Sequence, residues 1–370
     1  MEHPLKTQLT LFLTNACNLN CVYCYEHRKN REIMSLECAL SWIEKCLTQK
    51  DVFVDIYLFG GEPLLQFNLL RDICEWTWER DWPAKYHFMV QTNGTLLNQE
   101  MKHWFLKHRE QISMCLSIDG QKATHDANRN NSFDKIDLAY FLNTWPEQPV
   151  KMTISKSNIS TLKDDVVWLQ EKGFSIRGCN LAIGEGDYTP VFFDEIERQL
   201  KLLADYYIAS PQIPIAPIIN LPLYILSTDD RPQRISCNIG TEKLIVVNTD
   251  GSTAPCSYFS NSSLGKENRE RLLQELSSIQ IEKIVCYSKC PFFPICDMCY
   301  GENYSDTGNI YTPAEYKCKL MKIRIAASMY VLANRISQKA DGDMTYEDKL
   351  TINTIQSYYK QLTSEYYENI

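Results

Sequence analysis

The sequence has no apolar run long enough to cross a bilayer. The N-terminal stretch MEHPLKTQLTLFLTNACN has only a short apolar run and no small-residue cleavage site after it, so it does not resemble a signal peptide. There is also no basic block or stripe, and the formal net charge is -8, which argues against binding to nucleic acid. We therefore expect a cytoplasmic protein that has neither a membrane nor a nucleic acid among its partners.

Histidine is scarce, and its spacing gives no metal site. The six histidines show no ligand-like pattern, and His27 and His125 are expected to be surface or turn residues. Composition is otherwise ordinary, with 44% hydrophobic and 23% charged residues. At 370 residues the chain exceeds what one compact core usually carries, so we expect two units in contact.

Cysteine, in contrast, is abundant, with fifteen residues. A disulfide scaffold suits small secreted chains rather than one of this size. Buried, unreactive cysteine would explain scattered residues, but three cysteines fall within residues 17–24 and seven more between 237 and 318. Metal ligation explains this clustering better.

The first half alternates between strand-like and helix-like segments. Short apolar runs begin near residues 7, 51, 85, 112, 149 and 174. Helical patterns lie between them, at Ser35–Gln49 (with Ser35 as N-cap), Phe67–Arg80, Gln99–His108, Phe133–Asn143 and Thr161–Lys172. Six such repeats predict an α/β fold with parallel strands and right-handed crossovers. Functional groups are then expected at the carboxyl ends of the strands, where the cysteine loop, GGEP, TNG and DG all lie.

The second half has a different pattern. A helix over about Asp194–Ala209 precedes the proline-rich connector SPQIPIAPIINLPLYIL, and KLIVVNTDGSTAPC predicts a β-hairpin. Little regular structure is expected from Cys286 to Cys318. A helix is expected at Ile323–Gln338, and the tail from Ala340 is expected to form a weakly docked helix or to fray.

The first cysteine group resembles the radical S-adenosylmethionine (SAM) superfamily. Its spacing is C-x3-C-x2-C, with an aromatic residue directly before the last cysteine. A zinc site would need a fourth protein ligand, because structural zinc prefers a closed shell. The resemblance implies instead that Cys17, Cys21 and Cys24 form the catalytic centre by holding a [4Fe-4S] cluster, whose open iron takes SAM. It also implies a partial (β/α)6 barrel.

The same resemblance implies further SAM contacts at the strand ends. Tyr23 would pack near the adenine, and the GGEP motif would contact the SAM ammonium through Gly60, Gly61, Glu62 and Pro63. Asn93, Ser117 and Asp119 occupy positions that line the SAM site in relatives. TNG and DG are also ordinary turn sequences, so a purely structural role stays open for these three residues.

The later cysteines resemble the SPASM domain of peptide-modifying radical SAM enzymes, a small cysteine-rich domain with two auxiliary [4Fe-4S] clusters. The resemblance gives one cluster, auxiliary II, to Cys286, Cys290, Cys296 and Cys318, and the other, auxiliary I, to Cys237, Cys256 and Cys299. The segment reads C-x3-C-x5-C-x2-C where the family usually has C-x2-C-x5-C-x3-C. Auxiliary I finds three cysteines, so a stray cysteine, another side chain or a substrate thiolate would complete it. The expected segments are a barrel at 1–185, a connector at 186–236, the SPASM domain at 237–322 and a helical tail at 323–370.

Five cysteines remain outside these groups. Cys38, Cys46 and Cys74 are most simply core residues, and Cys115 is expected to pack inside the barrel. Cys179, near the end of the sixth strand, is the stray cysteine with the best prospect of a functional role.

The two resemblances imply an enzyme that uses a 5'-deoxyadenosyl radical to modify a ribosomally made peptide, by oxidative cross-linking through a thioether or carbon–carbon bond. The expected partners are a precursor peptide and an electron donor such as flavodoxin or ferredoxin. Only sixteen residues precede Cys17, so leader recognition would need a separate protein or another surface of the chain. One alternative is an anaerobic sulfatase maturase, against which Ser257 argues, because those enzymes carry an acidic residue there. The other is a non-catalytic iron–sulfur electron carrier, which would not need GGEP.

Overall fold

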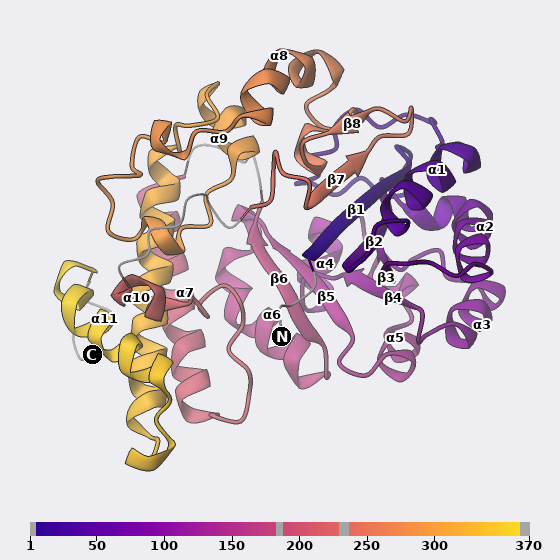
Figure 1. Cartoon of the computed structure of the whole chain (residues 1–370). Coiled ribbons are helices and arrows are strands. Elements are labelled where there is room, and N and C mark those ends of the chain that lie inside the picture. Colours follow the sequence, from indigo (N-terminus) through magenta and orange to yellow (C-terminus); the bar gives the residue numbers. More distant parts are fainter. Residues whose placement is uncertain (1–4, 183–187, 229–236, 363–370) are drawn as a thin grey trace.

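A curved sheet with helices packed on its outer face forms the centre of the molecule (Figure 1). The computed structural model describes residues 5–182, 188–228 and 237–362. Six strands appear where the sequence predicted them: β1 (Leu5–Thr14), β2 (Val52–Gly60), β3 (Lys85–Thr92), β4 (Ile112–Ser117), β5 (Pro149–Ile154) and β6 (Ser175–Leu181). Each pairs in parallel with the next, so the predicted parallel sheet is confirmed.

The crossover helices also match the predicted segments closely. They are α1 (Leu36–Leu47), α2 (Phe67–Trp78), α3 (Gln99–Lys107), α5 (Leu138–Thr144) and α6 (Leu162–Glu171). Ser35 caps α1 as expected, because its side chain accepts a hydrogen bond from the backbone N–H of Cys38 at 3.2 Å. The segment 133–143 differs, since a 3-10 turn at Phe133–Lys135 precedes α5. Helix α4 (Lys122–Asn128) was not predicted from the sequence.

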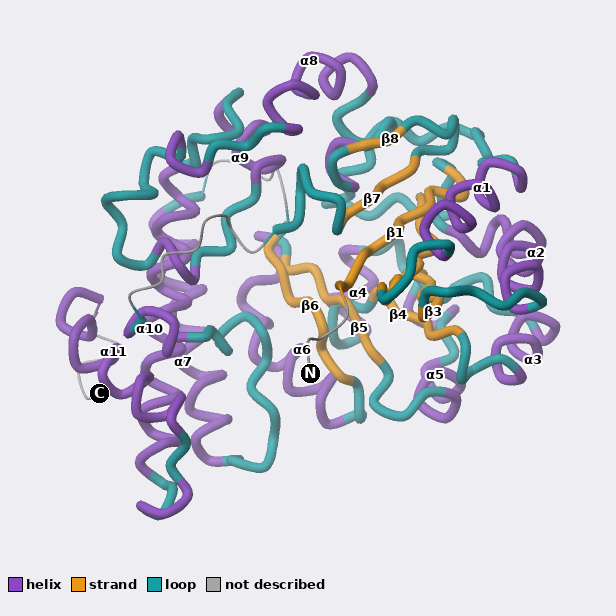
Figure 2. The backbone as a smooth tube through the Cα atoms, in the orientation of Figure 1, coloured by secondary structure: helices purple, strands orange, loops and turns teal. Residues whose placement is uncertain are grey.

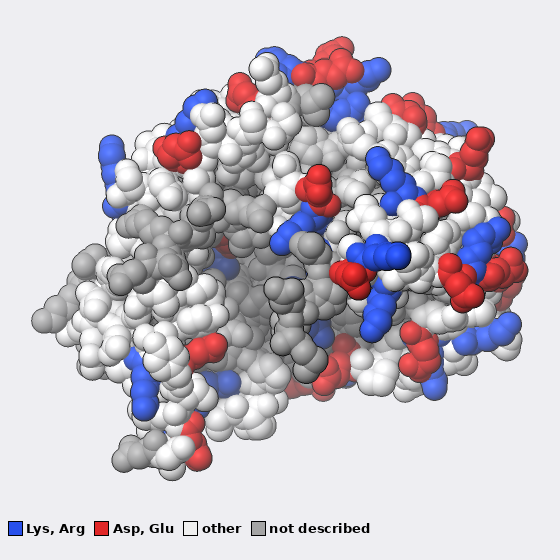
Figure 3. All heavy atoms as spheres, in the orientation of Figure 1, with Lys and Arg blue, Asp and Glu red and all other residues white. Residues whose placement is uncertain are grey.

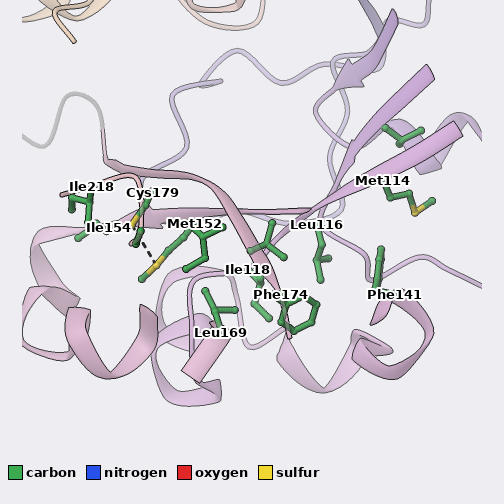
Figure 4. Close-up of a cluster of buried hydrophobic side chains, with 14 of the residues drawn as sticks. Met114, Leu116, Ile118, Phe141, Met152, Ile154, Leu169, Phe174, Cys179 and Ile218 are labelled. Carbon is green, nitrogen blue, oxygen red and sulfur yellow. Dashed lines mark hydrogen bonds between the residues drawn. The ribbon is translucent and has the colours of Figure 1, made fainter. Parts of the chain in front are cut away.

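The main core fills the layer between this sheet and its helices. Alternate residues of β5 point into it, so Val150, Met152 and Ile154 are fully buried while their neighbours face the barrel interior. Figure 4 shows Met152 near Ile118 and above Leu169 of α6, with Ile154 on its other side, near Cys179. This alternation leaves Lys151 and Thr153 on the interior side of the sheet, where a site can form.

The second half of the chain adds two strands to the same sheet. β7 (Leu244–Val247) and β8 (Thr253–Ala254) form the predicted antiparallel hairpin. β7 also pairs in parallel with β1, from Gln8↔Leu244 to Leu11↔Val247, which gives the strand order β6-β5-β4-β3-β2-β1-β7-β8. The segment boundaries expected from the sequence stay predictions, but residues from both halves share one sheet.

Helices make up most of the remaining structure. They are α7 (Pro190–Ala209), α8 (Lys266–Ser277), α9 (Tyr300–Thr307), α10 (Glu315–Ser337) and α11 (Tyr346–Leu362). α7 and α10 lie side by side, and α11 packs on α10, so the expected tail helix is docked (Figure 2). The expectation of little regular structure between Cys286 and Cys318 was wrong, because α9 forms there and Cys318 lies in α10. No helix within the described ranges is long and apolar enough to span a membrane.

Candidate functional site

The loop after β1 places the three clustered cysteines over the carboxyl ends of the strands. Cys17, Cys21 and Cys24 are all half-buried and line a cavity of about 190 Å³. The other predicted site residues on its wall are Tyr23, Gly60, Gly61, Glu62, Asn93 and Ser117. The structure therefore gathers residues from four separate loops and strand ends around one space.

The two glycines of GGEP are required by the chain's own backbone. A Cβ atom on Gly60 would collide with the carbonyl oxygen of Thr14, and one on Gly61 with that of Ala16. Gly60 also has a φ of +137°, a conformation that other residues rarely adopt. The amide of Gly61 donates to the Thr14 carbonyl at 2.9 Å, so the motif fastens the end of β2 to the start of the cysteine loop.

Glu62 is the buried carboxylate of this motif. It is 1% exposed and accepts hydrogen bonds from the backbone amide of Asn93 at 2.8 Å and the hydroxyl of Thr92 at 2.7 Å. Burial nevertheless raises the pKa of Glu62 to about 7, because the charged form loses its hydration. Pro63 begins the short 3-10 helix that follows and is buried outside the cavity lining.

Asn93 and Ser117 have both structural contacts and access to the cavity. The side chain of Asn93 accepts from the Thr95 amide at 3.0 Å, as expected of a turn, and donates to Asn18 in the cysteine loop at 3.0 Å. Ser117 accepts from Gln91 at 2.7 Å. Asn93 and Ser117 can therefore stabilise the local structure and still line the cavity.

Asp119 lies beneath the cavity wall, where its carboxylate holds the surrounding side chains. It is fully buried and forms a salt bridge with Arg129 at 2.9 Å. It also accepts hydrogen bonds from the Tyr23 hydroxyl, Asn128 and the backbone amide of Thr153. With its oxygens occupied in this way, Asp119 is suited to positioning Tyr23, and the SAM contact expected from the sequence stays an untested prediction.

The three half-buried thiols suit an iron–sulfur cluster better than a single ion. Burial raises the pKa of Cys17 to about 11 and also raises that of Cys21, so ligation would have to displace their protons. No three His, Cys, Asp or Glu side chains in the described ranges converge tightly enough to hold one metal ion. A cluster places each thiolate on a different iron and does not need that convergence. The donor set of three thiols around an open cavity therefore fits a cluster that has one free position.

A second cavity, of about 360 Å³, collects five of the later cysteines. Cys286, Cys290, Cys296 and Cys318, which the sequence grouped together, all line it, with Cys299 beside them. In addition to burial, the thiolate charge of Cys318 raises the pKa of Cys286 and of Cys296. The thiolate charge of Cys290 likewise raises the pKa of Cys286 and of Cys318. This predicted ligand set is thus brought together in space, although its role stays a prediction.

The third predicted set, Cys237, Cys256 and Cys299, is also brought together. Burial raises the pKa of the Cys256 thiol far above its usual value, and the neighbouring Cys299 and Cys237 add to that increase. Tyr25, directly after Cys24, packs its ring 5.5 Å from that of Tyr258, two residues after Cys256. The first cysteine loop and this group are therefore in contact.

The end of β6 joins the two cavities. Asn180, Leu181 and Ala182 line both of them, so the cavity of the first cysteine loop opens beside that of the later cysteines. Cys179 lines the second cavity, but its sulfur lies 3.8 Å from that of Met152 and points into the core (Figure 4). Cys46, Cys74 and Cys115 are buried as expected, and Cys38 is half-buried.

Several residues differ from the expectation or were missed. His125 was expected at the surface or in a turn, but it is 1% exposed in α4, while His27 is exposed as expected. The sequence analysis did not identify Glu26, Arg129 or Lys151 as cavity residues. Glu26 lies in the loop after Cys24, Lys151 in β5 and Arg129 directly after α4, but nothing local showed that the fold would bring these charged residues to the cavity.

The family is decided by the first part of the chain. The model of the Radical SAM superfamily matches residues 11–138, which carry the cysteine loop and the GGEP motif. This part of the chain belongs to the radical SAM superfamily. This family implies SAM and a [4Fe-4S] cluster as cofactors, in agreement with the donor set of the first cavity.

Relatives within the superfamily include proteins with and without a described activity. The chain is 27% identical to the uncharacterized protein MJ0907 of Methanocaldococcus jannaschii, over 76% of this chain and 94% of that one. It is 26% identical to the radical SAM cyclopropyl synthase TigE of Paramaledivibacter caminithermalis, over 54% of this chain and 46% of that one.

Solved structures share the fold over most of the chain. Native anSMEcpe with bound AdoMet and Kp18Cys peptide matches with a TM-score of 0.66 and 19% identity, over 90% of this chain and 98% of that one. Streptococcus suis SuiB bound to precursor peptide SuiA matches with a TM-score of 0.59 and 15% identity, over 85% of this chain and 76% of that one. The barrel and the cysteine-rich C-terminal region thus have the architecture of SPASM-type maturases. This chain is a radical SAM enzyme related to peptide-modifying maturases.

Proposed function

We propose that the enzyme oxidatively cross-links a ribosomally made peptide, through a thioether or a carbon–carbon bond. The observation that carries the proposal is the contact between two thiol-lined cavities at Asn180–Ala182. A peptide residue in the first cavity could be activated while staying beside a second site able to take up an electron. A simple electron carrier has no use for a Gly-Gly-Glu site, so the first cavity favours an enzyme.

The residues of the first cavity would hold the family's cofactors in a defined orientation. Cys17, Cys21 and Cys24 would ligate the cluster, and Glu62 would accept hydrogen bonds from the SAM ammonium. When bound, this pair supplies a 5'-deoxyadenosyl radical that can remove a hydrogen atom from an unactivated carbon. Asp119 and Arg129 would keep Tyr23 in place against the adenine.

The later cysteines support the oxidative part of the proposal. Closing one cross-link removes two hydrogen atoms from the peptide, so an electron acceptor is needed beside the first cavity. Cys286, Cys290, Cys296 and Cys318 would hold one auxiliary cluster, and Cys237, Cys256 and Cys299 would hold the other. Such clusters supply one-electron acceptors.

The set of three cysteines at auxiliary I supports a thioether as the product. Three thiolates on a four-iron cluster leave one position for a further ligand, and a cysteine of the substrate could take it. This part of the proposal requires a cysteine in the peptide. Adding the peptide should change the electron paramagnetic resonance spectrum of auxiliary I, and the same peptide with Cys→Ser should not. A fourth protein ligand on that cluster would contradict it.

The test of the function is co-expression of the enzyme, under anaerobic conditions, with short open reading frames that neighbour its gene. The expected product is a peptide that lacks two hydrogen atoms per cross-link, as seen by mass spectrometry, with the bond located by fragmentation. The matched control replaces Cys17, Cys21 and Cys24 by Ala and should leave every peptide unchanged. If the parent enzyme cleaves SAM but alters none of these peptides or a cysteine-containing peptide library, the proposed function is wrong.

A further inference from the structure

Glu26 is not among the residues expected to bind the cluster or SAM. It lies two residues after Cys24, is 5% exposed and lines the first cavity. Its Oε2 atom is buried and has no hydrogen-bond partner among the residues that the structure describes. A buried carboxylate oxygen without a partner destabilises a fold, because it has lost its hydration and gained no hydrogen bond in exchange. A group that supplies the missing donor is therefore the natural occupant of the space beside it.

The contacts of Glu26 leave one of its two carboxylate oxygens without a partner among the described residues. The hydroxyl of Ser262 donates to its carboxylate, and the positive charges of Lys29 and Lys151 act on it from further away. The ammonium of Lys29 is engaged by the carbonyl of Leu19 at 2.9 Å. Within the described ranges, neither lysine forms an ion pair with Glu26. Glu26 thus combines a carboxylate oxygen that lacks a described partner with a place on the cavity wall.

Glu26 belongs to a different part of the cavity from Glu62. Glu62 is bonded to Thr92 and Asn93, at the end of β3. Glu26 instead shares the cavity wall with Lys151 of β5, the strand next to β6, whose end lines both cavities. A substrate that reaches both cavities has to pass this part, while SAM is expected at the other.

The chain also fixes Glu26 against the cysteine-rich half. The backbone amide of Arg28 donates to the Ser262 carbonyl at 2.9 Å, and the guanidinium of Arg28 packs against Gly265. Ser262 follows Cys256 by one short turn. The carboxylate therefore sits where the cysteine loop, the barrel strand β5 and the segment of the predicted auxiliary I ligands meet.

We propose that Glu26 is a substrate-binding residue whose free carboxylate oxygen accepts a hydrogen bond from a backbone N–H of the peptide next to the residue that reacts. The ammonium of Lys151, which forms no hydrogen bond or ion pair with a described residue, donates to the peptide carbonyl on the other side. Together they hold one peptide unit across the cavity by its two polar groups. This inference rests on the proposed function, since it requires a peptide substrate.

The first test measures stability without any peptide. If Glu26 is kept for binding, the reconstituted Glu26→Gln enzyme should unfold at a higher urea concentration than the parent, because an unpartnered buried charge has been removed. The matched control is Glu44→Gln, at an exposed glutamate of α1, which should leave the midpoint unchanged. A lower midpoint for Glu26→Gln would assign the residue a structural role and overturn the inference.

The second test measures binding with a pooled library of synthetic cysteine-containing peptides as the probe. The reconstituted parent should retain a subset of the pool, and Glu26→Ala should retain that subset at least about tenfold less well, as for loss of a hydrogen bond to a charged group. The iron content and the SAM affinity of Glu26→Ala are expected to match those of the parent. The Lys151→Met variant should also weaken capture of the same subset.

Three other results would overturn the inference. Equal capture by Glu26→Ala and the parent would reject it and leave the proposed function standing. A parallel loss of SAM affinity in Glu26→Ala would move the residue to the SAM site. Failure of the parent to capture any peptide would reject the proposed function and this inference with it.

Discussion

The two thiol-lined regions of the molecule are built in different ways. The main core of the barrel consists of apolar side chains, and Cys17, Cys21 and Cys24 stand outside it, in a loop above the strand ends. In the cysteine-rich region the cores are small, and Cys237, Cys256, Cys286, Cys290 and Cys296 pack directly against them. The first set therefore contributes little to the packing of the fold, while the later set is part of it.

The charged surface shows no such division. On the face seen in Figure 3, Lys and Arg residues are interspersed with Asp and Glu over both halves. The difference between the regions thus lies in their interiors, and experiments that remove thiols, iron or buried charges should reveal it.

The largest effect is expected from the first cysteine set. Replacing Cys17, Cys21 and Cys24 together by Ala should abolish SAM cleavage and remove about a third of roughly twelve irons per chain. The fold should survive, because these thiols lie outside the core. Iron analysis, a SAM cleavage assay and circular dichroism measure these effects. The control variant Cys38→Ala should keep the iron content, the SAM cleavage and the fold of the parent. An iron content near four in the parent would contradict the assignment of the auxiliary clusters.

Removal of all the iron should affect the two regions unequally. After anaerobic chelation, hydrogen exchange should become fast over residues 237–322, because the packing of several cysteines there depends on their ligand geometry. Exchange in β2–β5 should stay slow, since their core contains none of the predicted ligands. Exchange measured by mass spectrometry on the same sample compares the regions directly. Equal loss of protection in both would show that the barrel also depends on iron.

Glu62 offers a smaller, local effect. Replacing it by Gln keeps the side chain's size but removes the charge, so SAM affinity should fall by about 10- to 100-fold if the carboxylate holds the ammonium. Calorimetry on the reconstituted enzyme measures this. Thr92→Val removes only one donor to Glu62 and should weaken SAM much less. An unchanged affinity in the Gln variant would remove Glu62 from the SAM site.

The smallest effect concerns the pH dependence of barrel stability. Burial lowers the pKa of His125 to about 4, and the nearby charge of Arg129 acts in the same direction. The unfolded chain, with a histidine pKa near 6.5, then binds the proton more readily than the folded one. Stability is therefore present above pH 6.5 and is lost as pH falls toward 4, by about 2 kcal/mol between pH 7 and 5.

Urea titrations at several pH values measure this slope. His125→Gln should flatten it, and His27→Gln, at an exposed position, should leave it unchanged. If the parent and His125→Gln lose stability equally on acidification, His125 does not cause the dependence.

Sequence reasoning recovered what depends on local pattern. The spacing of Cys17, Cys21 and Cys24, and the position of GGEP after an apolar run, were enough to place them together at the strand ends. The strands themselves followed from apolar runs separated by helical periodicity. These features depend on residues close together in the chain.

Contacts between distant segments could not be predicted in this way. No local signal showed that β7 would pair with β1. Nor did one show that the Asp119 carboxylate would form a salt bridge with Arg129 and accept a hydrogen bond from Tyr23. The burial of Glu26 depends on the Ser262 turn, far along the chain. Helix α9 was missed because clustered cysteines suggested a segment organised by ligands alone.

The pairing of β1 with β7 has a consequence for the order in which the protein forms during synthesis. Gln8 leaves the ribosome early, but its partner Leu244 follows only after nearly two thirds of the chain. At roughly 5–20 residues per second, the outer edge of β1 stays open for about 10 to 50 seconds. An open strand edge is a template for pairing with other chains. Nascent chains that end before residue 244 should therefore need protection by chaperones, and translation of the second half completes the barrel sheet.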